Sequence, residues 1–285
     1  MMNIAIIVTY NPDWSHIDCM AKELKNANVY PLIFDNTPSP NYSSSINELN
    51  IIGKEGNLGI AEGFNRGIDY ARNNFSFVDK YIFFDQDSSF ESADITALLN
   101  QYAAYEKNNI KVGVLGAKAI MPSGNPYPPK IFKGPEVIGA DHAWFVMSSF
   151  SIVSNEVLER VGLFKTEYFI DLVDSEFSFR CRKLGFYNLI SNEVNFKHVV
   201  GEERKSLGSC SYSISSPIRN YYQVRNVILM GKEYKWYTYI LKLLTKRFIL
   251  FTLSGLNEKD LLLRYKYMIL GIYHGFTGRT GKYPD

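Results

Sequence analysis

The first 120 residues alternate short apolar runs with amphipathic stretches, and this alternation limits the fold more than any other feature of the chain. Runs rich in β-branched and aromatic residues predict strands at 4–8, 29–34, 49–52, 81–84 and 112–119. Between them, apolar residues at helical spacing predict helices at 17–25, 61–73 and 93–106. This order is typical of an α/β domain with a largely parallel sheet, so we expect an α/β fold.

After residue 120 the pattern is less regular. Five prolines between residues 122 and 135 predict an irregular loop, and a strand is expected over 144–153. Helices are expected over 155–161 and from just after Asp174 to about residue 184. Beyond residue 215 the chain is helical in pattern, aromatic and basic. We therefore expect two domains, an α/β domain over residues 1–215 and a helical region over residues 216–285.

The net charge of +2 combines two unlike regions. Residues 231–285 contain ten Lys and Arg against four Asp and Glu, a local +6 that leaves −4 on residues 1–230. A total near zero gives no chain-wide basic footprint for nucleic acid. Three widely spaced cysteines form no disulfide framework, and three basic residues interrupt the apolar run at 240–253. We expect a cytoplasmic protein without a membrane span.

Polar segments follow three of the predicted strands, at residues 9–12, 35–38 and 85–89. In open α/β sheets, ligands bind beyond the carboxyl ends of the strands. We therefore expect these three loops to converge on one cleft, which is a candidate nucleotide site.

Two carboxylates one residue apart, Asp85 and Asp87, follow the strand at 81–84. In an extended segment positions i and i+2 point the same way, so both can address one hard cation that neutralises a diphosphate. A turn with solvated acids is an equally simple interpretation. An aspartyl phosphatase is a weaker alternative, because that family carries its acid pair on the first strand.

A second set of polar residues surrounds Asp174, which we expect to cap the following helix and to face the cleft. Simple capping explains this position; a general base that accepts a proton from an acceptor hydroxyl explains it as well. His198 ends the run 194–198, where an imidazole would complete the coordination of a cation held by Asp87; a structural histidine is the alternative.

Glycines in two segments invite comparison with phosphate loops. Gly59, Gly63 and Gly67 lack the dinucleotide-binding spacing and are explained by close helix packing. The segment 275–282 ends in Gly281 and Lys282, but its spacing and its following tyrosine do not fit a phosphate loop.

Taken in order, these segments resemble the family 2 glycosyltransferases, and within them the bacterial rhamnosyltransferases of O-antigen and capsule assembly. The resemblance covers nearly the whole chain. The matching segments are 8–12, 34–37, 57–59 with Asn65, 85–88, 161–164, 169–171, 174–180, 216–222 with Arg225 and Asn226, and 275–279.

The resemblance implies a GT-A fold, a nucleoside-diphosphate sugar donor and inversion at the anomeric carbon. It assigns a Mg²⁺ or Mn²⁺ site to Asp85, Asp87 and His198. Asp174 aligns with the catalytic base, although Val173 replaces the family's preceding Glu, and Asp171 is a second candidate. The residues expected at the donor are Thr9, Tyr10, Asn11, Asp35, Asn57, Asn65 and Asp85.

The substrates implied are dTDP-rhamnose and a lipid-linked saccharide acceptor. UDP-galactofuranose or another UDP-hexose is the alternative donor, and a metal-dependent phosphohydrolase or a non-catalytic nucleotide-sugar binder is a weaker alternative. Aromatic and basic residues near Trp236 and Lys246 suit an anionic membrane surface, so the enzyme is expected peripherally on the inner face of the cell membrane. A helical subdomain or homodimer interface explains the same pattern.

Overall fold

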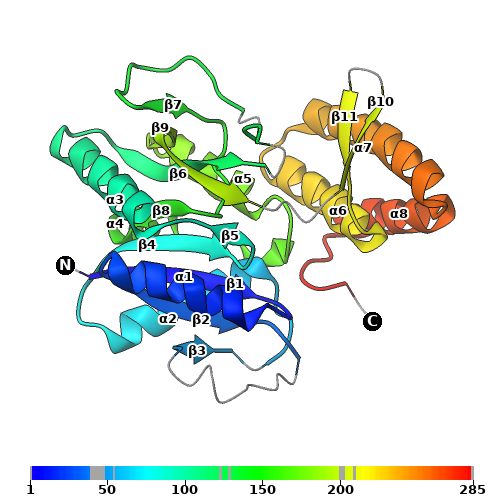
Figure 1. Cartoon of the computed structure of the whole chain (residues 1–285). Helices are drawn as coiled ribbons and strands as arrows, with labels where there is room; N and C mark the ends of the chain where they lie inside the picture. Colours follow the sequence, from blue (N-terminus) through cyan, green and yellow to red (C-terminus); the bar gives the residue numbers. More distant parts are fainter. Residues whose placement is uncertain are drawn as a thin grey trace. The chain divides into compact units, whose positions relative to one another are not determined.

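The fold is described from a computed structural model, which covers residues 2–38, 49–53, 55–121, 124–127, 130–198, 203–207 and 210–283, with side chains described outside 198–214 (Figure 1). The chain forms two compact units. The α/β unit contains Met1–Lys165 and Asp174–Val199, and the helical unit contains Thr166–Val173 and Val200–Asp285.

One mixed sheet organises the α/β unit. Within the described residues it contains nine strands in the order β3-β2-β1-β4-β8-β6-β9-β5, with β7 paired to β9. The pairs β1–β2, β1–β4, β2–β3 and β6–β9 are parallel, whereas β8 runs antiparallel to β4 and β6. The strands are β1 (Met2–Thr9), β2 (Val29–Asp35), β3 (Ile51–Ile52), β4 (Val78–Asp85), β5 (Ser88–Ser89), β6 (Val112–Ile120), β7 (Ala140–His142), β8 (Ser151–Ser154) and β9 (Tyr187–His198).

Helices follow the strands in the predicted order. The Asp13 carboxylate caps the first helix by accepting the Ser15 N–H at 3.0 Å, and Glu91 with Asp94 forms a capping box at the third. These elements are α1 (Trp14–Asn26), α2 (Ile60–Asn74), α3 (Ser92–Lys107), α4 (Asn155–Val161) and α5 (Val173–Lys183).

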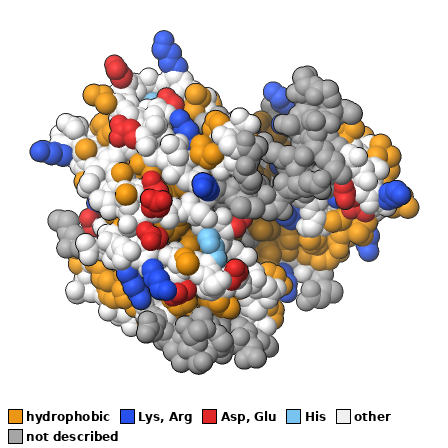
Figure 2. Space-filling view, in the orientation of Figure 1, with side chains coloured by type: hydrophobic (Ala, Val, Ile, Leu, Met, Phe, Trp, Pro, Cys, Tyr) orange, Lys and Arg blue, Asp and Glu red, His pale blue; other side chains and the backbone are white. Residues whose placement is uncertain are grey.

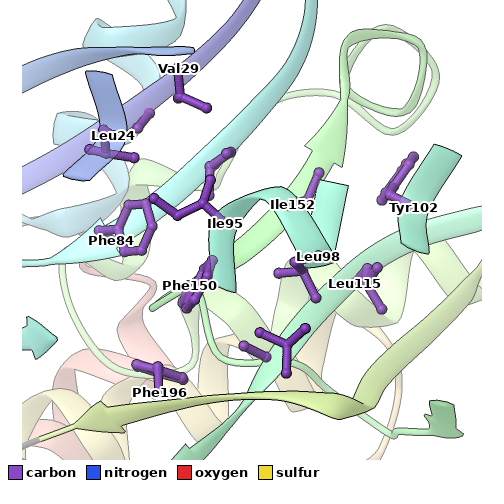
Figure 3. Close-up of a cluster of buried hydrophobic side chains, with 14 of the residues drawn as sticks. Leu24, Val29, Phe84, Ile95, Leu98, Tyr102, Leu115, Phe150, Ile152 and Phe196 are labelled. Atoms are coloured by element: carbon purple, nitrogen blue, oxygen red, sulfur yellow. The ribbon is translucent and has the colours of Figure 1, made fainter. Parts of the chain in front are cut away.

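The alternation of side chains along β1 decides which helices cover which face. Ala5 and Ile7 belong to a buried cluster with residues of α1 and α3, part of which is drawn in Figure 3. On the opposite face, a Cβ on Gly63 of α2 would come within 2.9 Å of Val8, and one on Gly67 within 2.6 Å of Ile6. The glycines of α2 therefore serve close helix packing, as the sequence indicated.

The strand expected over 144–153 is wrong for most of its length. Only Ser151–Ser154 forms β8, and the preceding residues are a loop. Phe150 takes a left-handed backbone with φ +54°, and its N–H donates to the carbonyl of Phe83 at 2.7 Å. A left-handed residue of this kind turns the chain out of an extended path, so the apolar run cannot continue as one strand.

Three helices make up most of the helical unit: α6 (Pro217–Glu233), α7 (Tyr237–Glu258) and α8 (Leu261–Thr277). A hairpin of β10 (Glu203–Leu207) and β11 (Cys210–Ile214) precedes them. Gly271 and Gly275 let α8 approach α6, because a Cβ at Gly271 would lie 2.7 Å from the carbonyl oxygen of Tyr221. Across the described part of the chain, we find no helix that combines the length and apolarity needed to span a membrane.

Candidate active site

The polar loops after β1, β2 and β4 are joined by hydrogen bonds, as the sequence predicted. The Thr9 hydroxyl donates to Asp35 Oδ1 at 3.0 Å, and the Asn11 N–H donates to the Thr37 hydroxyl at 2.8 Å. The Tyr10 N–H donates to Gln86 Oε1 at 2.6 Å. The three carboxyl-end loops therefore form one continuous rim.

The acidic pair lies in a turn. Asp85 ends β4, Gln86 and Asp87 form the turn, and Ser88 begins β5. The expectation that Asp85 and Asp87 share one side of an extended segment is therefore wrong. The middle residue of this acidic turn carries a role that the sequence did not indicate, because Gln86 fixes the turn to the loop after β1.

Two consecutive serines connect the acidic turn to Asp174. The Ser149 hydroxyl donates a short hydrogen bond to Asp85 Oδ2, and the backbone N–H of Ser148 donates to Asp174 Oδ2 at 3.2 Å. Both serines are buried. We call Ser148 and Ser149 the serine link. Asp85 and Asp174 lie 89 residues apart in the sequence, and the serine link binds them through two adjacent residues of one loop.

Asp174 lies in the first turn of α5, which begins at Val173. The expectation that Asp174 itself caps this helix is therefore wrong. Its side chain lines a small hollow together with Ser148, Phe164 and Ser178. A carboxylate within the first turn is still favourably placed, because the helix dipole stabilises negative charge there.

A buried ion pair holds the helix that carries Asp174. Glu176 is fully buried, and the Arg180 Nε lies 2.8 and 2.9 Å from its two carboxylate oxygens. The Arg180 guanidinium also donates to the carbonyls of Val161 and Leu163, at 2.6 and 2.8 Å. This network ties α5, the helix that carries Asp174, to the end of α4 and the segment after it.

Several residues expected at the donor instead hold the surrounding loops. Asn65 uses both ends of its amide on Phe164, donating to the carbonyl at 2.8 Å and accepting the N–H at 3.0 Å. Asn57 accepts the Gly59 N–H at 3.0 Å. Thr9 and Asp35 are buried. Tyr10 and Asn11 are exposed on the rim.

Asn36, which our donor assignment left out, supports the same rim. It is buried, and its side chain accepts the Leu58 N–H at 2.9 Å and donates to the Gly59 carbonyl at 3.2 Å. The only signal in the sequence was its place in the polar segment after β2. Ser148 and Ser149 gave a comparable signal, a polar pair that interrupts an apolar run.

Asp171, the second candidate base, belongs to the helical unit. Its two carboxylate oxygens accept hydrogen bonds from the Arg219 guanidinium, at 2.7 and 3.3 Å. Its carboxylate is therefore engaged in a bidentate ion pair within that unit.

The donor atoms at the acidic turn suit a hard cation. Asp85 Oδ1 is buried, and among the described residues no hydrogen-bond donor reaches it. The His198 side chain lies outside the described residues, but its backbone pairs with Ser88, the residue after Asp87. Among described side chains, no complete set of three acidic, histidine or cysteine ligands is assembled.

No protein-family model matches the chain. The dTDP-rhamnosyl transferase RfbF from Shigella flexneri is 30% identical over 303 residues, covering 97% of this chain and 96% of its own length.

Two solved structures are similar to the chain to different degrees. GalNAc-T7, crystallised with UDP, GalNAc and Mn²⁺, matches with a TM-score of 0.59 and 12% identity over 81% of this chain, which spans about half (48%) of that protein. The catalytic domain of Drosophila β1,4-galactosyltransferase 7, in complex with xylobiose, matches with a TM-score of 0.44 and 17% identity over 70% of this chain and 71% of its own. The α/β unit with C-terminal helices has the GT-A type of fold.

Proposed function

Because the chain belongs to the glycosyltransferase family that includes dTDP-rhamnosyl transferase RfbF, we propose that it transfers rhamnose from dTDP-rhamnose to an acceptor hydroxyl, with inversion. The observation that carries this proposal is the serine link, which holds Asp85 and Asp174 by adjacent residues of one loop. A transferase of this kind needs a diphosphate site and a proton acceptor side by side. We place the enzyme in family 2, as the motifs suggest.

In this proposal the rim residues bind the donor. Exposed Tyr10 and Asn11 contact the nucleoside, while Thr9, Asp35 and Asn57 hold the loops in place through the hydrogen bonds described above. Asn65 acts indirectly, because it fixes the backbone of Phe164, which lines the same hollow as Asp174.

Asp174 takes the proton of the acceptor hydroxyl as that oxygen attacks the anomeric carbon from the face opposite the diphosphate. The Ser148 N–H stabilises the carboxylate as an anion and fixes its direction. The attacking oxygen forms the new glycosidic bond, and the nucleoside diphosphate leaves with the electrons of the old one.

Asp85 and Asp87, with His198 as a further ligand, are the residues we propose for Mg²⁺ or Mn²⁺. The Asp85 oxygen that has no hydrogen-bond partner among the described residues fits this assignment, since a buried carboxylate oxygen is costly without a partner. When bound, such a cation supplies positive charge that offsets the charge of the departing diphosphate. Ser149 orients the Asp85 carboxylate through its hydrogen bond to Oδ2.

The test is a donor screen combined with variants. The purified protein is offered dTDP-, UDP- and GDP-sugars with and without Mn²⁺, and hydrolysis, transfer and binding are measured. We expect Asp174→Asn to lower turnover by about 10²-fold or more while donor binding persists. Glu156→Gln, at a side chain that is 71% exposed, serves as the control and keeps full turnover.

The outcomes of the donor screen and of the variants distinguish the candidate bases, donors and functions. Normal turnover by Asp174→Asn overturns the assigned base, and a larger loss in Asp171→Asn than in Asp174→Asn moves the role to Asp171. A preference for UDP-galactofuranose or another UDP-hexose replaces the rhamnosyl donor. Phosphate release from simple phosphoesters, with no acceptor present, points to a phosphohydrolase. Binding without turnover on any donor points to a nucleotide-sugar binder.

We further propose that the acceptor is a lipid-linked saccharide of O-antigen or capsule assembly, met at an anionic membrane surface. Apolar side chains are exposed over the helical unit (Figure 2). Along α8 they recur three and four positions apart, which places them on one face with a lysine among them. That stripe is Leu262, Lys266, Ile269, Tyr273 and Phe276.

Flotation with liposomes of increasing anionic lipid content tests this surface. We expect binding to rise with lipid charge, and to fall in Ile269→Glu but not in Glu156→Gln. Absence of binding, with a mass in solution twice that of the chain, favours the homodimer interface. The membrane proposal and the identity of the catalytic base are independent, so either can fail without the other.

A further inference from the structure

One short segment of the helical unit is held in a conformation that its residues disfavour. Phe169, Asp171 and Leu172 have φ values of +62°, +63° and +64°, in the left-handed region. Side chains with a Cβ rarely adopt this region. Three such residues within four positions persist only where neighbouring groups fix them, and strain of this kind clusters at functional sites.

The neighbouring groups are two buried side chains of α6, which we call the Arg225–Asn226 clamp. The Asn226 amide nitrogen donates to the carbonyls of Tyr168, Ile170 and Asp171, at 3.0, 2.7 and 2.9 Å. Asn226 is fully buried, so its N–H groups have these backbone oxygens in place of water. One side chain thus fixes three carbonyls of the left-handed segment.

Arg225 orients that amide and extends the clamp. Its Nε donates to Asn226 Oδ1 at 3.0 Å, which directs the Asn226 nitrogen toward the segment. Its terminal nitrogen donates to the carbonyls of Glu167 and Tyr168, at 3.1 and 3.0 Å. Arg225 is fully buried, and buried guanidinium groups are costly unless hydrogen-bonded. These hydrogen bonds together hold the backbone of residues 167–172 in its conformation.

The glycine-rich stretch near the C-terminus braces the same segment. Arg225 donates a short hydrogen bond to the Gly281 carbonyl, and the Gly281 N–H donates to the Glu167 carbonyl at 2.8 Å. Gly281 has φ +76°, which explains the glycine there. The Tyr283 N–H then donates to the Tyr222 hydroxyl at 2.8 Å. The stretch that superficially suggested a phosphate loop thus has a structural role.

We propose that Arg225 and Asn226 are positioning residues for sugar transfer, acting through the left-handed segment. The segment ends at Leu172, two residues before Asp174, so its backbone path sets how the chain leads into the first turn of α5. Loss of the clamp lets Phe169, Asp171 and Leu172 relax to ordinary backbone angles. The proposal rests on the function proposed above, with Asp174 as the base.

The test compares Asn226→Asp and Asn226→Ala with Ile240→Ala. The Asp variant keeps the volume and the oxygen that accepts from Arg225 but removes the N–H donors. Ile240 is buried on α7 against Gly231, so its truncation weakens the same unit at a place that contributes no bond to the clamp. We expect both Asn226 variants to lose about 10²-fold in kcat with little change in the donor KM, since small displacements at a reacting centre have effects of this size.

Hydrogen exchange supplies a readout that does not depend on turnover. Peptides covering residues 166–173 should exchange faster in both Asn226 variants than in Ile240→Ala. Wild-type kcat in either Asn226 variant, or an equal loss of kcat in Ile240→Ala, overturns the positioning role. If Asp174→Asn is active, the proposed base fails, whereas exchange at 166–173 still decides whether the clamp holds the segment. If Asp174→Asn is inactive and Asn226→Asp is fully active, only the positioning role fails.

Discussion

Replacement of Asp85 by Asn should separate metal binding from a purely structural role of this carboxylate. One oxygen accepts the Ser149 hydroxyl hydrogen, and the other is buried with no donor among the described residues. A buried polar atom left unpaired costs about 1–3 kcal/mol. Without metal, Asp85→Asn should be about as stable as wild type, because the amide also leaves a buried polar group unpaired but carries no charge to desolvate.

In the presence of the metal, the wild type should be more stable than Asp85→Asn. A cation at 100 times its dissociation constant stabilises the folded state by about 2.7 kcal/mol. For a chain of this size each kcal/mol raises Tm by roughly 2–4 °C, so the wild type should gain about 5–10 °C. Asp85→Asn should lose most of that gain, because the amide oxygen is a weaker ligand for a hard cation than a carboxylate.

The assay is thermal unfolding followed by circular dichroism, in EDTA and in rising Mn²⁺ or Mg²⁺, each with and without dTDP. Asp18→Asn, an acid paired with Lys22 on the outside of α1, is the matched control and should respond like wild type. A full metal-dependent shift in Asp85→Asn refutes the assignment. A lower Tm of that variant in EDTA, together with a full metal-dependent shift, would mean that the role of the carboxylate is purely structural.

Three further predictions concern groups outside the cleft. Glu176→Gln should cost about 3 kcal/mol in urea unfolding, since it leaves the largely buried Arg180 without its anion; a cost below about 1 kcal/mol would contradict this. Burial lowers the pKa of His274 below its usual 6.5, so unfolding takes up a proton and stability should fall as pH drops below 6.5, a trend absent in His274→Gln. Burial raises the pKa of Cys181 to about 12, so a thiol reagent should label Cys19 at once and Cys181 only on unfolding, as peptide mass spectrometry can follow.

Local periodicity was enough to predict most of the α/β unit. The apolar stripe of α2 and the alternation along β1 are each set within a few residues, because each element has one face to bury. The convergence of the loops after β1, β2 and β4 follows equally well, since parallel strands end at one edge of the sheet. Contacts across that edge, such as Tyr10 with Gln86, then hold the rim together.

The serine link could not be predicted from local sequence patterns, because the contacts that form it are not local. Residues 144–153 have the composition of a strand, and local preference alone favours one. The loop forms because Phe150 turns left-handed and donates to Phe83, 67 positions earlier, while Ser149 and Ser148 find partners 64 and 26 positions away. The only local sign of these tertiary hydrogen bonds is the polar pair inside an apolar run.

The choice between two carboxylates three residues apart also depends on tertiary partners. By spacing alone, Asp171 and Asp174 are equivalent. Arg219 engages both oxygens of Asp171, so proton transfer to Asp171 would have to disrupt a bidentate ion pair. Asp174 accepts a backbone N–H at one oxygen and lines a hollow beside the serine link, an arrangement that fixes the direction of its carboxylate. This difference supports our proposal that Asp174, rather than Asp171, is the base.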